Sequence, residues 1–153
     1  YIEGTCSGSK PMSSSEDDLA LRNLMAKYAD AVNRRDGETW ATTWAEDARW
    51  NLMGTDVEGR GNIVALWQQM MASFEFAVMI PGSCLFEING DKASGHWYLQ
   101  EFTRDLEGNS ASVLGRYLDT YQKRDGHWLY QSREVSFIYH GPADLSGNYT
   151  APS

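Results

Sequence analysis

Cysteine, clustered histidine and long apolar runs are all scarce in this sequence. Its two cysteines, Cys6 and Cys84, are too few for a disulfide framework, and the apolar run around Cys84 predicts a buried thiol. The three histidines are scattered, without the spacing of a metal site. We therefore expect no metal and no cofactor. No stretch approaches the roughly 20 consecutive apolar residues of a membrane span, which argues against a membrane partner.

Positive charge is also in short supply. The chain carries 13 Lys and Arg against 21 Asp and Glu, giving a formal net charge of −8. An acidic chain without a basic run repels phosphate backbones, so we exclude nucleic acid as a partner. Because the N-terminus has no secretory apolar segment, we expect a cytoplasmic protein.

Aromatic residues, by contrast, are plentiful. They make up 12% of the chain and include six Trp and eight Tyr. This is more aromatic surface than a small core needs, and it fits either an aromatic-lined cavity or simply an aromatic-rich core. The 153 residues suit one domain. We expect a tag-like or disordered segment over 1–14, the domain over 15–141 and an extended tail over 142–153.

Apolar residues recur at helical spacing in the first half of the chain. The first such segment follows the acidic run that starts at Glu16, which favours a helix N-terminus. In the second, Trp40 and Trp44 share one face, and in the third Asn62 is the expected cap. We predict helices over 16–35, 38–46 and 62–72, with a small hairpin over 49–58.

The second half of the chain predicts strands. Asp125-Gly126 lies between two aromatic, β-prone runs and is a strong hairpin signal, because both turn residues tolerate positive φ. Pro81-Gly82 interrupts an earlier strand, where a bulge or bend is expected. The expected strands cover 74–89, 93–105, 111–124 and 127–140.

Helices that precede an antiparallel sheet predict an α+β fold. Long, bent strands suit a sheet that curls around the first helix. Such a cone has a closed apolar bottom and a polar mouth, which suits a small-molecule site.

Several short runs appear in a characteristic order between residues 16 and 140. They are Tyr28-Ala-Asp-Ala-Val-Asn33, Trp44-Ala-Glu-Asp47, Gly59-Arg-Gly61, Ile88-Asn-Gly-Asp91 and Gly115-Arg-Tyr-Leu-Asp119. In this order they resemble the SnoaL-like family of the nuclear transport factor two-like superfamily. That branch includes scytalone dehydratase, bile-acid dehydratase and polyketide cyclases. The resemblance implies a cone-shaped α+β barrel: three N-terminal helices packed in a strongly curved, mixed but mostly antiparallel sheet.

The resemblance also implies acid–base chemistry without a cofactor. Dehydratases of the branch carry an Asp near the end of the first helix and a His on the first long strand. By spacing, the Asp position falls on Asn33 and the His position on Val78 or Met79. Both members of that pair are therefore missing, and an Asn side chain cannot act as a base.

Strand alternation supplies other candidates. If Leu99 faces the cavity, so do Trp97, Glu101 and Thr103. The resemblance places Val113, Gly115 and Tyr117 inward on the next strand. It also turns Arg133, Val135 and Phe137 inward on the last strand.

Glu101 is the inward carboxylate among these residues, and the bile-acid dehydratase branch also carries a carboxylate there. Desolvation in an aromatic cavity would raise its pKa towards that of a useful general base. An unpaired ion is costly, so a partner is expected. Arg133 could be that partner, either binding a substrate oxyanion or forming a purely structural ion pair, and Arg104 is the other possibility.

Tyr28 and Tyr117 can each pack a ring and donate a hydrogen bond to a substrate oxygen, or serve only as core tyrosines. Asn33 can orient a substrate hydroxyl or a water. His140 reaches the mouth only if the tail folds back. We predict catalytic roles for Glu101, Tyr28, Asn33, Tyr117 and Arg133. We predict substrate-binding roles for Trp50, Val78, Met79, Trp97, Leu99, Val113 and Phe137.

The sequence therefore predicts a cofactor-independent lyase or isomerase. It would act by proton transfer on a hydrophobic aromatic or polycyclic oxygenated molecule, by elimination of water or formaldehyde or by cyclisation. A non-catalytic module that binds a small molecule or a protein is the alternative. We also expect a homodimer or homotrimer, because the outer sheet face is apolar. Its residues are His96, Tyr98, Leu118, Tyr130 and Ile138.

Overall fold

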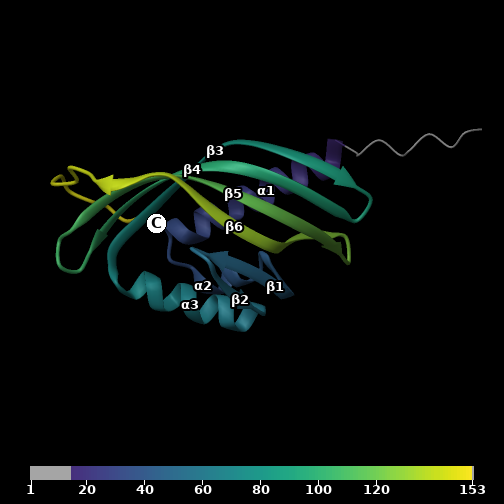
Figure 1. Cartoon of the computed structure of the whole chain (residues 1–153), viewed down its shortest axis with the longest axis horizontal. Helices are drawn as coiled ribbons and strands as arrows, with labels where there is room; N and C mark the ends of the chain where they lie inside the picture. Colours follow the sequence, from purple (N-terminus) through teal and green to yellow (C-terminus); the bar gives the residue numbers. More distant parts are fainter. Residues whose placement is uncertain (1–14, 153) are drawn as a thin grey trace, which may run out of the picture.

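A computed structural model describes residues 15–152 and shows three helices and six strands (Figure 1). Its fold is α+β, as the sequence predicts. The helices are α1 (Ser15–Asn33), α2 (Gly37–Ala41) and α3 (Arg60–Ala72). The strands are β1 (Trp44–Leu52), β2 (Thr55–Glu58), β3 (Phe74–Asn89), β4 (Lys92–Asp105), β5 (Ser110–Arg124) and β6 (His127–Pro142).

One mixed sheet contains all six strands in the order β2-β1-β6-β5-β4-β3. Every neighbouring pair is antiparallel except β1 and β6, which run parallel. The sheet curls over α1 without closing, and α3 lies beside β1 and β2 (Figure 1). This is the curved, mostly antiparallel sheet that the sequence predicts.

The β5–β6 hairpin forms at the predicted turn. Its two loop residues have positive φ, 50° at Asp125 and 77° at Gly126. Those angles match the twist of the flanking strands. The two strands stay paired to the far end of the sheet, where Ala111 pairs with Pro142, but their register shifts twice on the way.

Strand irregularities decide which side chains face inward. The register of β3 shifts between Pro81 and Cys84, as the Pro-Gly pair predicts. β6 contains a register shift that the sequence does not predict: Ser132 pairs with Thr120, but Tyr130 pairs with Tyr121. The extra residue reverses the alternation, so Tyr130 is fully buried. Its expected place on the outer face is wrong.

The second helix is shorter than predicted. It ends at Ala41, and Trp44 already begins β1. Thr42 is its C-cap, and the Thr43 hydroxyl donates to the carbonyl of Trp40 at 2.7 Å just past the helix end. The rings of Trp40 and Trp44 still pack together, with centroids 5.6 Å apart. The prediction that they lie side by side is confirmed, but they do not share one helix.

The third helix begins two residues before its predicted start. Gly59 occupies the N-cap position with φ of 85°, and no side chain caps the helix. Asn62 instead donates to the carbonyl of Glu58 at 2.9 Å, so the expected Asn62 cap is wrong. Ile63 and Trp67 point into the core as expected.

The C-terminal tail packs on the outer face of the sheet rather than hanging free. Tyr149 stacks on Phe76 with ring centroids 4.5 Å apart. Arg104 donates to the carbonyl of Leu145 at 2.9 Å. Residues 143–152 have no regular secondary structure. Cys84 is a buried free thiol, as predicted. Residues 1–14 and their expected character lie outside the described part of the chain.

Candidate functional site

A cavity of about 450 Å³ lies between the inner face of the sheet and the helices α1 and α3. A volume of this size falls in the usual range of small-molecule sites. Its walls are mostly aromatic and aliphatic side chains. The larger ones are Tyr28, Trp50, Trp67, Met70, Met71, Phe74, Met79, Leu99, Tyr117 and Phe137.

Glu101 on β4 is the polar side chain that stands out in this apolar cavity. Burial raises the pKa of its carboxyl group to about 7. Among the described residues, no hydrogen bond or ion pair to this carboxyl group is found. An open cavity beside an unpaired carboxylate is the arrangement that distinguishes a reactive group from a sealed structural ion pair.

Asp105, at the end of β4, is a second carboxylate on the cavity wall, but it is fully occupied. Its oxygens accept from the backbone N–H groups of Glu107 and Asn109 and from the Asn109 side chain. These hydrogen bonds, the side-chain bond first, lower the pKa of Asp105. Two cavity carboxylates thus have opposite environments, and only Glu101 is suited to take up a proton near neutral pH.

Tyr28 from α1 and Tyr117 from β5 line the cavity with their rings 6.4 Å apart. Burial raises the pKa of both hydroxyl groups, so both remain protonated hydrogen-bond donors. The nearby charge of Arg133 opposes the effect of burial at each tyrosine. The pair can therefore hold a substrate oxygen as negative charge develops on it.

Arg133 does not reach Glu101, and the expected Glu101–Arg133 ion pair is absent. It binds Asp119 instead through two parallel hydrogen bonds of 2.8 Å, and both side chains are completely buried. Burial alone would lower the pKa of Arg133, but Asp119 raises it above its ordinary value. The Arg104 alternative is also wrong, since Arg104 pairs with Glu75 at 2.7 Å.

Aromatic rings enclose the Arg133–Asp119 pair behind the cavity. The Arg133 guanidinium lies 3.8 Å from the ring centroid of Tyr117 and 4.4 Å from that of Tyr28. Trp97 donates its indole N–H to Asp119 at 2.9 Å. Arg133 and Trp97 thus support the cavity tyrosines and do not line the cavity themselves.

Asn33 and Val78 also lie outside the cavity. Asn33 bonds both backbone groups of Met79, which ties the end of α1 to β3. Val78 alternates with Met79 and falls on the other face of the sheet, whereas Met79 lines the cavity. The other predicted cavity residues do line it: Tyr28, Trp50, Leu99, Glu101, Val113, Tyr117 and Phe137.

The sequence interpretation missed the role of Asp119 and left the position of His140 open. Asp119 follows Tyr117 by two residues, so strand alternation alone could have placed it inward. His140 lines the cavity although no simple alternation predicts it. Its position depends on a second register shift in β6, between Phe137 and Tyr139.

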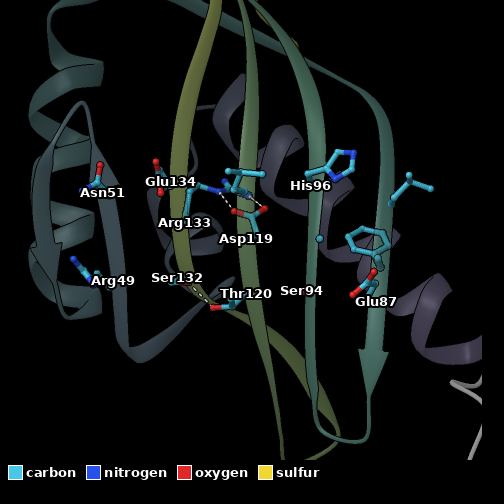
Figure 2. Close-up of a pocket in the computed structure, with 14 residues that line it drawn as sticks. Arg49, Asn51, Glu87, Ser94, His96, Asp119, Thr120, Ser132, Arg133 and Glu134 are labelled. Carbon is cyan, nitrogen blue, oxygen red and sulfur yellow. Dashed lines mark hydrogen bonds and ion pairs between the residues drawn. The ribbon is translucent and has the colours of Figure 1, made fainter.

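A second hollow of about 620 Å³ lies on the opposite, outer face of the sheet (Figure 2). Figure 2 shows polar side chains from neighbouring strands side by side, with Thr120 and Ser132 joined by a 2.5 Å hydrogen bond. The Arg133–Asp119 pair lies at its floor. Its other carboxylates, Glu87 and Glu134, are exposed, whereas Glu101 lies among apolar side chains, so we place the functional site in the inner cavity.

Within residues 15–152, no group of three or more His, Cys, Asp or Glu side chains could hold a metal ion. In the same part of the chain, no helix is long and apolar enough to cross a membrane.

The family model for the SnoaL-like domain matches residues 13–134. Among characterised proteins, the gamma-hexachlorocyclohexane dehydrochlorinase of Sphingobium indicum is 25% identical over 140 residues, covering 87% of this chain and 86% of the relative. Hexachlorocyclohexane dehydrochlorinase 2 of another strain of that organism matches equally well.

Solved structures share the fold. A crystal structure of the dehydrochlorinase LinA superposes with a TM-score of 0.78 at 24% identity, covering 90% of this chain and 95% of that one. A scytalone dehydratase-like protein of Novosphingobium aromaticivorans gives a TM-score of 0.78 at 17% identity, covering 85% of this chain and 89% of that one. These likenesses show that the cone architecture is shared.

Proposed function

Because the chain belongs to the SnoaL-like domain family, we propose that it is a lyase that works without a cofactor. Its substrate would be a hydrophobic aromatic or polycyclic oxygenated molecule, and its reaction an elimination begun by removal of a proton from carbon. The observation that carries the proposal is the unpaired Glu101 carboxyl group in an apolar cavity, with its pKa raised to about 7.

The chemistry follows from the environment of each group. A carboxylate stripped of water is a stronger base than one in solution, and a pKa near the working pH suits a group that must both take and return a proton. Tyr28 and Tyr117 would hold the substrate oxygen that becomes negatively charged. The rings of Trp50 and Phe137 would pack on the substrate ring.

The dehydrochlorinase relatives support the reaction class. A dehydrochlorinase also removes a proton from carbon and expels a leaving group. This chain has Asn33 where the resemblance places the helix carboxylate, so its base would come from β4 instead of α1. The base therefore lies on the sheet wall of the same cone.

The test uses 5-nitrobenzisoxazole, a flat aromatic probe that opens to a coloured phenolate when a base removes its carbon-bound proton. We expect turnover by the wild type, with kcat/KM rising to a plateau through a midpoint near pH 7. Glu101→Gln should lose about 100-fold or more. Glu87→Gln, which removes a carboxylate from the outer hollow, is the matched control and should keep full activity.

Full activity in Glu101→Gln would remove this residue from the role of base. A midpoint near the ordinary glutamate value would show that the carboxyl group is not desolvated in solution.

A further inference from the structure

Glu101 and His140 occupy the same row of side chains across the sheet. Glu101 on β4 pairs with Val113 on β5, and Val113 pairs with His140 on β6. All three line the inner cavity. Their backbones are therefore two strand spacings apart, about 10 Å, with only the small Val113 side chain between them.

A bulge in β6 turns His140 into the cavity. Phe137 pairs with Gly115, but Tyr139 pairs with Leu114, so Ile138 is an extra residue on β6. The extra residue changes the alternation, which is how Phe137 and His140, three positions apart, both line the cavity. Their rings lie 6.0 Å apart. Bulges of this kind commonly redirect a side chain beside a functional site.

His140 complements Glu101 better than the other titratable groups of the cavity do. Asp105 is held by its own loop through three hydrogen bonds. Tyr28 and Tyr117 are made weaker acids by burial, which raises the pKa of both. An imidazole can give and take a proton near neutral pH, and His140 stands on the exposed side of the cavity.

We propose that His140 is the general acid of the reaction, protonating the leaving group while Glu101 removes the proton from carbon. This inference rests on the proposed function. Glu101 takes the proton, and the electron pair of the C–H bond forms the new double bond. The bond to the leaving oxygen breaks, and that oxygen receives the proton of the His140 imidazolium. The products are an alkene and an alcohol or water, and a proton then passes from Glu101 to His140 through solvent.

Two test substrates distinguish the role of the general acid from that of the base. They are the ketones 4-(4-nitrophenoxy)-2-butanone and 4-(4-methoxyphenoxy)-2-butanone. Nitrophenoxide leaves without help, whereas the more basic methoxyphenoxide needs a proton. We expect His140→Gln to slow methoxyphenol release by about 100-fold and nitrophenol release by less than about threefold. Exchange of the proton at carbon 3 with D₂O, followed by NMR, should persist in His140→Gln and disappear in Glu101→Gln.

His127→Gln is the matched control, because His127 is exposed at the β5–β6 turn and lies outside the cavity. An equal effect of His140→Gln on both ketones, or none on either, would overturn the acid role. Persistence of carbon-3 exchange in Glu101→Gln would instead overturn the proposed base, whatever His140→Gln does. Absence of wild-type turnover of both ketones would overturn both assignments.

Discussion

Asn33 holds Met79 by both of its backbone groups. The Met79 amide donates to Asn33 Oδ1 at 2.7 Å, and Asn33 Nδ2 donates to the Met79 carbonyl at 2.9 Å. A carboxylate could accept the first bond but would face the carbonyl oxygen without a proton to offer. Asn33 therefore ties the end of α1 to β3.

We expect Asn33→Asp to destabilise the fold by about 1–3 kcal/mol, since it leaves one partly buried carbonyl unpaired. Urea unfolding would measure the change. Asn23→Asp, on an exposed position of the same helix, is the control and should shift the free energy of unfolding by less than about 0.5 kcal/mol. Equal stability of both variants would show that the two hydrogen bonds contribute nothing.

Breaking the buried Asp119–Arg133 pair should cost far more than breaking a surface pair. Asp119→Asn leaves the fully buried Arg133 charge uncompensated, and a loss of about 3–5 kcal/mol is expected. Asp56→Asn breaks the exposed pair with Arg49 and should cost less than about 1 kcal/mol. Similar unfolding midpoints for the two variants would contradict this ranking.

Glu101 makes stability depend on pH with a definite sign. Its pKa is raised from 4.5 to about 7 by burial, so between these values the folded protein holds a proton that the unfolded chain has lost. Wild-type stability should therefore fall as the pH rises through this window. Relative to Glu101→Gln the difference should reach at most about 3 kcal/mol.

Urea unfolding of both proteins below and above this window measures the difference. Glu87→Gln serves as the control and should follow the wild type at each pH. A wild-type stability that rose relative to Glu101→Gln over the same window would show a lowered pKa instead of a raised one.

Much of the fold was predictable because its signals are local. Asp125-Gly126 specifies its turn through φ alone, and Leu21, Leu24 and Tyr28 specify the buried face of α1 through their spacing. Alternation from Leu99 correctly placed Glu101 on the cavity wall.

The errors in the predicted site come from effects that no local sequence pattern reveals. Tyr130 and His140 were misplaced or left open because bulges in β6 change its alternation. Arg133 was paired with the wrong carboxylate because Asp119 and Glu101 both face inward, and only the packed rings decide which one it meets. Asn33 was predicted to face the cavity, but its bonds to Met79 depend on how α1 docks on β3.

The outer face of the sheet leads to the last prediction. It exposes apolar side chains on four adjacent strands, more than a solvated face needs. They are Ile80, Leu85, Tyr98, Leu114, Leu118, Ile138 and Tyr139. We propose that this face joins copies of the chain in a homodimer or homotrimer. Light scattering should give a mass two or three times that of the chain.

Leu118→Glu tests which face is used. Leu118 is 39% exposed on β5, in the middle of the sheet, so a charge there should shift the protein to monomer. Leu19→Glu places the same charge on α1, at a leucine that is 58% exposed, and should leave the mass unchanged. A monomeric wild type would refute the assembly, and dissociation by Leu19→Glu alone would move the interface to the helix. A sheet-face interface would leave the inner cavity of each copy open, because Leu118 and Glu101 lie on opposite faces of the sheet.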